Sequence, residues 1–276
     1  MSAAALRDSI ERIAASASPV REEARAAVAD LLDALEAGTV RAASPSAGGW
    51  EVHAWVKRGL LLAFRHGADV SSHVAPFHFR DRDTLPARDA AAPGIRVVPG
   101  GTTIRRGAHL GPGVIVMPPA FVNVGAFVGA ATMIDSHALV GSCAQVGERV
   151  HVSAAVQIGG VLEPPGAMPV VVEDDAFLGA GSGLYEGVRV GRGAVLAPGV
   201  VLTRALTLFD LARERTIVAD TAGVLAIPER AVVVPGSRPA KGTFASSHGI
   251  SLYAPVIVKY RDAGTDAAAA LEGALR

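Results

Sequence analysis

Two residues capable of acid–base chemistry lie close together in the middle of the chain. Asp135 and His137 are separated by a single serine in the stretch TMIDSHALV. Carboxylate and imidazole groups often accept the proton of an attacking nucleophile, and the ordinary pKa of histidine suits this role near neutral pH. Either residue can therefore serve as a general base. The structural alternative is that an aspartate simply suits a tight corner and a histidine an outward surface.

A six-residue period predicts the elements that position these residues. Large aliphatic residues recur at every sixth position from Val98 to Ile158, and the period resumes from Val172 to Leu202 after a loop at residues 163–171. A hexapeptide period is a known repeat signature, in which each repeat is one short strand and one corner. Three repeats make an 18-residue triangular coil. The sequence predicts a mainly β fold with a left-handed parallel β-helix over residues 94–203.

Small residues fill the other positions of each repeat. A small or β-branched residue such as Ala108 or Ala126 follows four positions after most of the aliphatic residues, where only a small side chain fits inside the prism. Glycine, asparagine or aspartate often follows directly, as at Gly111, Asn123 and Asp135. We expect these residues to adopt the left-handed backbone that tight corners require.

The flanking segments differ from the repeat region. Residues 1–93 predict a helical domain, with one helix capped by Ser18 and Pro19 and ended by Gly38, and another from Trp50 to Arg65 ended by Gly67. The second helix is expected to bury Trp50, Trp55, Leu61, Leu62 and Phe64, and a linker with Pro76, Pro86 and Pro93 follows. Residues 204–276 predict a small β-rich segment, with strands at 231–236 and 251–262 and a closing helix at Ala267–Leu275.

Composition narrows the functional classes. The 276 residues include 26 Lys plus Arg and 26 Asp plus Glu, so the net charge is zero, which argues against a nucleic-acid scaffold or a polybasic membrane-surface protein. The N-terminal stretch contains Arg7, Glu11 and Arg12, and we expect neither a signal peptide nor a membrane span. The sole cysteine, Cys143, fits a reducing, cytoplasmic compartment and is interpreted as a packing residue rather than a nucleophile.

Histidines raise the alternative of a zinc enzyme built on the same repeat. Such a site needs converging ligands, and the central candidates are His109, His137 and His151. His109 and His151 are 42 residues apart, which is not a whole number of 18-residue coils. They should therefore face different sides of the prism, and we predict no metal site.

Several stretches of the chain, in order, carry a family resemblance. They are WVKRGLLLAFR after Trp50, IRVVPG, RRGA, VIVMP, FVNVGAFV, TMID, VGSCAQVG, IGGVLEP, VVVPGSRPAKG and SLYAPVIVK. The chain resembles the tetrahydrodipicolinate N-succinyltransferases of the lysine and diaminopimelate pathway over almost its whole length. The resemblance implies a homotrimer, active sites in the clefts between neighbouring prisms, and an acyl-CoA donor, either succinyl-CoA or acetyl-CoA. It also implies a catalytic role for Asp135, which matches the Asp of TMVDTW, and a carboxylate-binding role for Arg96, which matches the Arg of RVVP.

The departures from the family pattern concern the expected acceptor pocket. The family pattern GARSEVVEG reads GAGSGLYEG here, so Gly181 replaces an Arg and Gly183 replaces the Glu that the family pairs with the catalytic Asp. His137 replaces a Trp, and Gln157 brings an amide where the family has Gly. We interpret these changes as retained acyl transfer with a changed amine acceptor, in which His137 takes over from the lost acid.

The site prediction combines these observations. The predicted catalytic residues are Asp135, His137 and Glu186, the last matching the second Glu of the pattern. Arg96, Ser153 and Gln157 are predicted to bind substrate. CoA is expected to contact the backbone at Gly159 and Gly160 and, through its phosphates, the side chains of Arg238, Lys241 and Lys259.

The predicted function is acyl-CoA-dependent N-acylation of an amino-dicarboxylate-like acceptor. One alternative is a related enzyme that acylates a different amino acid in specialised metabolism. Another, from a different class, is a non-catalytic trimeric scaffold that binds acyl-CoA. No nucleic-acid or membrane partner is expected.

Overall fold

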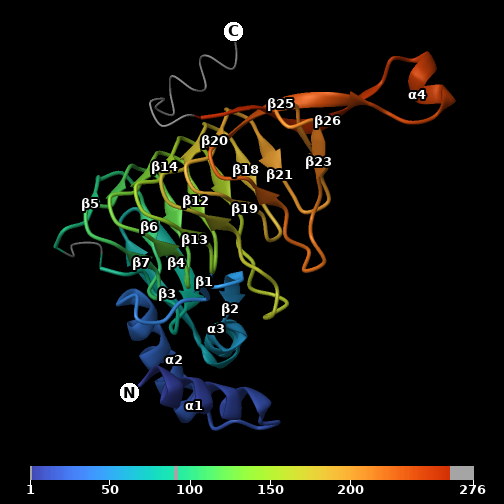
Figure 1. Cartoon of the computed structure of the whole chain (residues 1–276). Coiled ribbons are helices and arrows are strands. Elements are labelled where there is room, and N and C mark those ends of the chain that lie inside the picture. The colour runs from blue at the N-terminus through green and yellow to red at the C-terminus, as the bar shows by residue number, and fades with distance from the viewer. Residues whose placement is uncertain (1, 90–92, 262–276) are drawn as a thin grey trace.

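Short parallel strands stacked in three faces form the centre of the molecule (Figure 1). The computed structural model describes residues 2–89 and 93–261. Face I consists of β5 (Arg96–Val97), β8 (Ile115–Val116), β11 (Met133–Ile134), β14 (His151–Val152), β17 (Phe177–Leu178) and β20 (Val195–Leu196). Face II consists of β6 (Thr103–Ile104), β9 (Phe121–Val122), β12 (Leu139–Val140), β15 (Gln157–Ile158), β18 (Gly183–Leu184) and β21 (Val201–Leu202). Face III consists of β7 (His109–Leu110), β10 (Phe127–Val128), β13 (Gln145–Val146), β16 (Val171–Val172), β19 (Arg189–Val190) and β24 (Ala226–Ile227).

The six-residue period forms the core of this prism, as predicted. The aliphatic residues from Ile104 onward are buried, and each stacks on its counterpart one coil away, for example Val128 on Val146. The first coil departs from the prediction, because Val97 rather than Val98 pairs with Val116. One additional residue is accommodated beside Gly100 and Gly101, both of which have positive φ angles. The left-handed parallel β-helix is confirmed, with its register shifted by one residue at the start.

At the corners, the residue with the left-handed backbone is not the one that the sequence suggested. Positive φ angles occur three residues after most inward aliphatic residues, as at Gly125, Ala131 and His137, where φ is 75°, 56° and 63°. The expectation that Gly111, Asn123 and Asp135 adopt this conformation is wrong. A methyl group on Gly129, which occupies the equivalent place, would lie 2.5 Å from the carbonyl carbon of Gly147. Glycine is needed there because neighbouring coils approach closely.

One coil is longer than the others, where the sequence predicted a loop. Val146 pairs with Val172, 26 residues later, whereas Val128 pairs with Val146 after the regular 18. The buried Lys57 donates a hydrogen bond from Nζ to the carbonyl of Ala167 at 2.6 Å and so holds this loop against the N-terminal helices. Burial lowers the pKa of Lys57. The prism also continues past residue 203, since Ile227 and Val233 pair with Val190 and Leu196.

Three helices precede the prism and pack against its corner between faces II and III. They are α1 (Ala3–Ala15), α2 (Arg21–Glu36) and α3 (Ala54–His66). Leu31, Leu60 and Val56 share a core with Val124 and Cys143 of the prism. The predicted cap of α2 is wrong, because the helix begins after Val20, which makes no side-chain cap hydrogen bond. Gly38 follows the end of α2 with a φ of 73°, and Gly67 caps the end of α3, both as predicted.

The third helix is shorter than expected because a hairpin precedes it. Trp50 belongs to the antiparallel pair β1 (Ala43–Ser46) and β2 (Gly49–Val52), not to α3. Its indole Nε1 donates to Glu173 on the prism at 3.1 Å. Phe64 was also predicted wrongly, since it is exposed, whereas Lys57 is buried.

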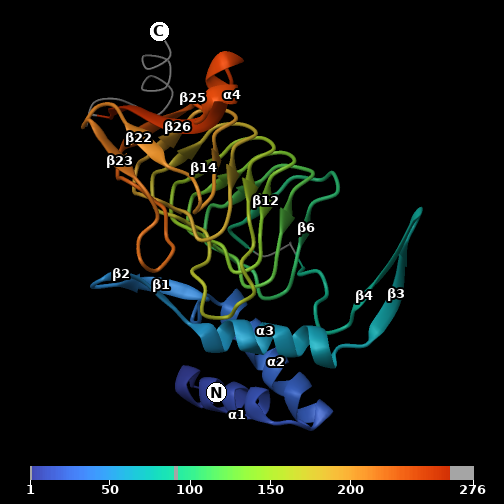
Figure 2. The ribbon, with the colours of Figure 1, turned by 90° about the vertical axis from the view of Figure 1, so that its right-hand side faces the viewer.

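A second hairpin projects where the sequence indicated a linker. It consists of β3 (Asp69–Val74) and β4 (Phe77–Arg82), with Pro76 in the turn between them. Figure 2 shows it extending away from the helices. Nearly every residue of the two strands is exposed, including Val74, Phe77 and Phe79.

The C-terminal part adds a long hairpin to face I. β25 (Ala231–Pro239) and β26 (Ser251–Tyr260) confirm the two predicted strands and project beyond the prism, with α4 (Thr243–Ser247) at the tip (Figure 1). β22 (Leu208–Asp210) and β23 (Arg215–Ile217) complete this sheet. The predicted helix at Ala267–Leu275 lies outside the described residues. Within residues 2–89 and 93–261, no helix has both the length and the apolar character to cross a membrane.

Candidate active site

Asp135 lies at the corner between faces I and II, directly after β11. Its backbone N–H donates to Val152 at 2.9 Å, and its carboxylate Oδ1 accepts from the N–H of Ser136 at 2.7 Å. The side chain is half-buried, so it is both fixed and accessible. A carboxylate held in this way can accept a proton from a bound amine.

Of the predicted substrate-binding residues, Ser153 shares the corner of Asp135, and Arg96 lies on the adjoining face I. Ile134 pairs with Val152, so Ser153 stands one coil from Asp135 at the same corner. Arg96 lies in β5, which pairs with β8, which in turn pairs with β11. Two coils correspond to about 10 Å of strand spacing. Arg96 is exposed at that distance from the coil of Asp135, on the outer side of face I.

The departures from the family pattern come together on face II. His137 is exposed at the corner, and its carbonyl accepts a long hydrogen bond from Nε2 of Gln157 at 3.4 Å. Gln157 also pairs directly with Gly183 in the next coil. His137, Gln157 and Gly183 are therefore neighbours on face II, and their place in an acceptor pocket stays a prediction. Gly181 lies at the corner before them, and a methyl group placed on it would meet no atom within 4 Å.

Tyr185 covers the place of the missing carboxylate, and the sequence prediction did not include it. A methyl group on Gly183 would lie 2.7 Å from Cε2 and 3.0 Å from Oη of Tyr185, and one on Gly159 would lie 2.9 Å from Cδ1. The ring therefore folds over both glycines. The signal was present in the sequence, because the change of Glu to Gly at 183 is accompanied by a change of Val to Tyr at 185.

Glu186 occupies a different corner from Asp135. A cavity of about 290 Å³ at the corner between faces II and III is lined by Gly159, Gly160, Tyr185, Glu186 and Arg204, together with the long loop. Nε of Arg204 lies 3.6 Å from the Glu186 carboxylate. Within one chain, therefore, Glu186 joins the glycines predicted to contact CoA, while Asp135 and His137 stand across face II.

The three cations predicted to meet CoA phosphates do not converge within one chain. Lys259 lies opposite Val232 near the base of the long hairpin, and Arg238 lies opposite Leu252 toward its tip. The six residues from Val232 to Arg238 span roughly 20 Å of strand. Lys241 follows at the exposed tip. The hairpin thus distributes these charges along an extended arm.

The histidines and the cysteine take the structural positions expected of them. His109 lies on face III beside Phe127, and His151 lies on face I beside Phe177, so they face different sides as predicted. Among the described residues, no three His, Cys, Asp or Glu side chains are grouped as metal ligands. Cys143 is fully buried among apolar residues, and burial raises its pKa to about 12, which makes it a packing residue rather than a nucleophile.

Comparison with known proteins agrees with this architecture. A family model described as the tetrahydrodipicolinate N-succinyltransferase N-terminal domain matches residues 6–66, and one described as the hexapeptide repeat of succinyl-transferase matches residues 169–204. A 2,3,4,5-tetrahydropyridine-2,6-dicarboxylate N-succinyltransferase from Parvibaculum lavamentivorans is 40% identical over 92% of this chain and 90% of its own. One from Granulibacter bethesdensis is 42% identical over the full length of both chains.

A solved structure of a hexapeptide transferase family protein from Anaplasma phagocytophilum aligns with a TM-score of 0.43 at 15% identity. That alignment covers 67% of this chain and 85% of that one. The identities of about 40% over nearly whole chains carry the assignment. The chain is an acyltransferase, and it belongs to the tetrahydrodipicolinate N-succinyltransferase family.

Proposed function

We propose that this acyltransferase transfers a succinyl group from succinyl-CoA to the amine of an amino-dicarboxylate-like acceptor, with acetyl-CoA as the other donor to be tested. The relatives that match the whole chain are named as tetrahydropyridine-dicarboxylate N-succinyltransferases. The observation that carries the proposal is the placement of Asp135 and Ser153 at one corner of the prism, with Arg96 on the adjoining face I. This arrangement offers a cation for a substrate carboxylate two coils, more than about 10 Å, from a carboxylate that can take a proton.

The proposed chemistry follows from the side chains present. The neutral amine of the acceptor attacks the carbonyl carbon of the thioester, a C–N bond forms, and the C–S bond breaks. Asp135 accepts the proton lost by the amine, and the released CoA thiolate takes up a proton to give the free thiol. His137, two residues away and exposed, is the second candidate for the proton acceptor. Arg96 holds a carboxylate of the acceptor.

The proposed active unit is a homotrimer in the cytoplasm. In one chain, Asp135 and Glu186 stand at opposite corners of face II. A neighbouring prism packed against that face would bring Asp135 of one subunit close to Glu186 and the predicted CoA-binding glycines of the other. The exposed apolar side chains of the hairpin β3–β4 support such an assembly, because an isolated two-stranded hairpin is marginally stable at best. The sole cysteine of the chain, Cys143, is buried and unpaired, which suits a reducing compartment.

A second acceptor class is favoured by one specific observation. Tyr185 places a neutral phenol over Gly183, where the family pattern has a carboxylate. Gly181 leaves open space where the pattern has an Arg, so a cationic fork for a second acceptor carboxylate is lost. The acceptor of this alternative is an amino acid with a single carboxylate, bound at Arg96, and with a hydrogen-bonding group that meets Tyr185.

A thiol-release assay separates these possibilities. Purified protein is incubated with succinyl-CoA or acetyl-CoA and with tetrahydrodipicolinate, L-2-aminopimelate or a panel of monocarboxylic amino acids. Rapid turnover of a dicarboxylate with succinyl-CoA supports the first proposal, and turnover confined to monocarboxylic acceptors supports the second. An absence of turnover with every acceptor, despite thermal stabilisation by CoA, would overturn both and indicate a binding scaffold.

A further inference from the structure

A second cavity lies far from face II, between the hairpin β1–β2 and face III. Its volume is about 410 Å³, and its wall includes Arg41, Trp50, His109 and Phe127. Trp50 belongs to the hairpin, and the two other aromatic residues belong to β7 and β10. None of these residues takes part in the proposed acyl transfer. The cavity is thus a separate space, formed where the N-terminal segment crosses the prism.

Arg41 is held rigidly in this cavity. Its guanidinium carbon lies 3.6 Å from the ring centroid of Phe127 and 5.5 Å from that of Trp50. Its Nε donates to Oε1 of Gln145 at 2.9 Å, and Gln145 is fully buried. Burial lowers the pKa of Arg41 to about 10, which still leaves the group charged at neutral pH. The aromatic contacts and the fixed Nε therefore orient a cation at low hydration.

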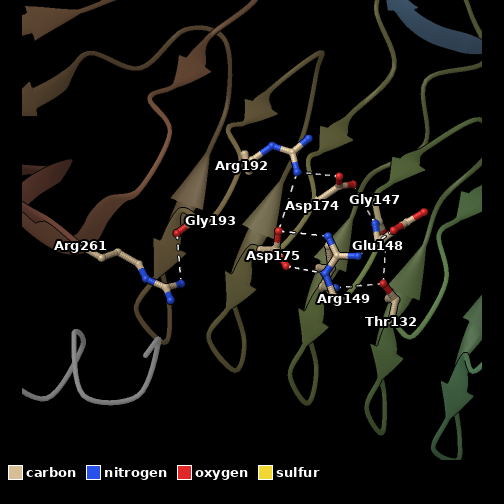
Figure 3. Close-up of polar contacts among 10 residues, drawn as sticks. Thr132, Gly147, Glu148, Arg149, Asp174, Asp175, Arg192, Gly193 and Arg261 are labelled. Carbon is tan, nitrogen blue, oxygen red and sulfur yellow. Dashed lines mark hydrogen bonds and ion pairs between the residues drawn. The ribbon is translucent and has the colours of Figure 1, made fainter. Parts of the chain in front are cut away.

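The outer part of this guanidinium makes no hydrogen bond to the described residues, although the negative charge of Asp174 acts on it. In residues 2–89 and 93–261, neither Nη nitrogen of Arg41 makes a hydrogen bond or an ion pair. The nearby carboxylates have other partners, as Figure 3 shows for Asp174 with Arg192 at 2.8 Å and Glu148 with Arg149 at 2.7 Å. A guanidinium fork normally binds a carboxylate or phosphate with two parallel hydrogen bonds. The fork of Arg41 is therefore open to an anion from outside the described residues.

The neighbouring groups decide which anion suits the cavity. Nδ1 of His109 donates to the carbonyl of Glu36 at 2.8 Å, and burial lowers the pKa of this histidine, so the imidazole adds no positive charge. The wall also contains Arg192, which is paired with Asp174, and the carboxylates of Glu148, Glu173 and the exposed Glu229. Carboxylates repel a dianion such as phosphate but attract an ammonium group. A ligand with one carboxylate and one ammonium group can meet both Arg41 and the carboxylates of the cavity wall.

We propose that this cavity is a binding site for a free amino acid, whose carboxylate is held by the Nη groups of Arg41 and whose ammonium group faces Glu229. The apolar part of the ligand lies against the cavity wall beside Trp50, because the guanidinium of Arg41 already covers the ring of Phe127. Because the site is on face III, its ligand does not compete with the acceptor at face II. Binding also connects the hairpin β1–β2 more firmly to the prism, so it stabilises the folded protein by mass action.

Isothermal titration calorimetry and thermal melting of the full-length protein test the site without any acyl transfer. The probes are L-glutamate, L-lysine and L-alanine, with propionate and ethylamine as the separated carboxylate and amine, and inorganic phosphate as a dianion. We expect at least one amino acid to bind and raise the melting temperature. The same amino acid should bind at least about tenfold more tightly than propionate, because propionate lacks the ammonium group.

The variant Arg41→Lys retains the charge but loses the fork, and Arg58→Lys makes the same change at an arginine that pairs with Glu11, away from the cavity. We expect Arg41→Lys to weaken amino-acid binding about tenfold or more and Arg58→Lys to leave it unchanged. Ligand-dependent tryptophan fluorescence, lost in Trp50→Phe, provides a second readout in the otherwise native protein, whose other tryptophan is Trp55. Absence of binding by all three amino acids, equal binding by propionate, or unchanged affinity in Arg41→Lys would overturn the assignment.

Discussion

The position of Asp135 depends on main-chain hydrogen bonds rather than on side-chain partners. Its N–H bonds to the next coil, and its carboxylate accepts from Ser136. The corner is therefore defined by the coil, while the carboxylate remains available for chemistry. A change of the carboxylate alone should affect the reaction much more than the fold.

We expect Asp135→Asn to lower kcat by about 10²–10⁴-fold, since an amide cannot accept the amine proton. The amide oxygen can still accept the hydrogen bond from Ser136, so the melting temperature should change little. Thiol release and thermal melting measure the two effects. The variant Asp30→Asn makes the same change at an exposed carboxylate on α2, so it is the control and should retain its turnover. Full activity in Asp135→Asn would move the role of base to His137.

The pair Gly183 and Tyr185 should behave as a unit. The double variant Gly183→Glu, Tyr185→Val restores the carboxylate of the family pattern and removes the ring that covers it. We expect it to raise kcat/KM for tetrahydrodipicolinate by about tenfold or more relative to the native protein, because a charge-assisted hydrogen bond is regained. Gly183→Glu alone should gain less, since Tyr185 occupies the same space. A loss of activity in the double variant would show that Tyr185 itself serves this acceptor.

At the scale of single residues, the sequence predicted which residues form the candidate site better than where those residues lie in the fold. Asp135 could be selected because it matches the family pattern, and His137, Gln157 and Gly183 because they depart from it. Tyr185 was missed because its role depends on a rotamer that folds back over two glycines. Glu186 was grouped with Asp135, but the prism turns by one face between the two positions.

A glycine that contacts the next coil should tolerate substitution less well than a glycine that only has a positive φ angle. A methyl group on Gly129 would lie 2.5 Å from the backbone of the next coil, whereas one on Gly199 would meet nothing within 4 Å, although φ there is 73°. We expect Gly199→Ala to lower the free energy of unfolding by about 1 kcal/mol, the usual cost of a left-handed alanine. Gly129→Ala should cost more than about 3 kcal/mol, because backbone cannot move aside as a side chain can. Urea unfolding compares the two, and equal losses would contradict the explanation from coil spacing.

The base of the projecting hairpin is held by a charge pair that acid should release. Both carboxylate oxygens of Asp83 accept from Arg25, at 3.0 and 2.8 Å, and one also accepts from the N–H of Ala68 at 2.8 Å. These hydrogen bonds, with that from Arg25 the largest cause, lower the pKa of Asp83 from 3.8 to about 2. The stabilisation is therefore complete above pH 3.8 and is lost as the pH falls toward 2. Asp83→Asn should be less stable than the native protein at pH 7, with the difference shrinking in that acid window.

The control for this comparison is Asp30→Asn, which changes an exposed carboxylate on α2. Urea unfolding at several pH values measures both variants against the native protein. A stability difference for Asp83→Asn that stayed constant from pH 7 to pH 2.5 would contradict the pairing with Arg25.

The elements outside the repeat were predicted less well, for a physical reason. The prism is specified by eleven consecutive matches to one period, whereas each hairpin is specified by a few residues and by its contacts with other parts. β1–β2 is held by Trp50 and Arg41 against the prism, which a helical pattern around Trp50 did not reveal. β3–β4 makes few contacts with its own chain, so no buried stripe marks it in the sequence.

The whole molecule exposes apolar surface on an arm that its own chain does not cover. Phe77 and Phe79 are 62% and 53% exposed. We expect sedimentation to show a trimer of the 28.1 kDa chain. The double variant Phe77→Ser, Phe79→Ser should shift it toward monomers and lower activity per chain in parallel, because each cleft needs a neighbouring prism. Val20→Ser, a change at a site that is 60% exposed on the N-terminal segment, is the control.

A monomer that retained full turnover would place the active site within one chain. If the double variant Phe77→Ser, Phe79→Ser remained a trimer, the contacts between subunits would instead lie on other surfaces of the prism. The two results are distinguished by measuring turnover and sedimentation on the same samples.

The stacked coils have one further consequence, for how such an enzyme can change during evolution. Inward residues and corner glycines hold the prism together, while the outward residues of each strand contribute little to that core. His137 is exposed and Gln157 half-exposed, while Gly183 lies beneath the ring of Tyr185. Mutations that alter the choice of substrate and mutations that threaten folding therefore fall on different positions. A duplicated gene could explore new acceptors on this scaffold while its product continued to fold.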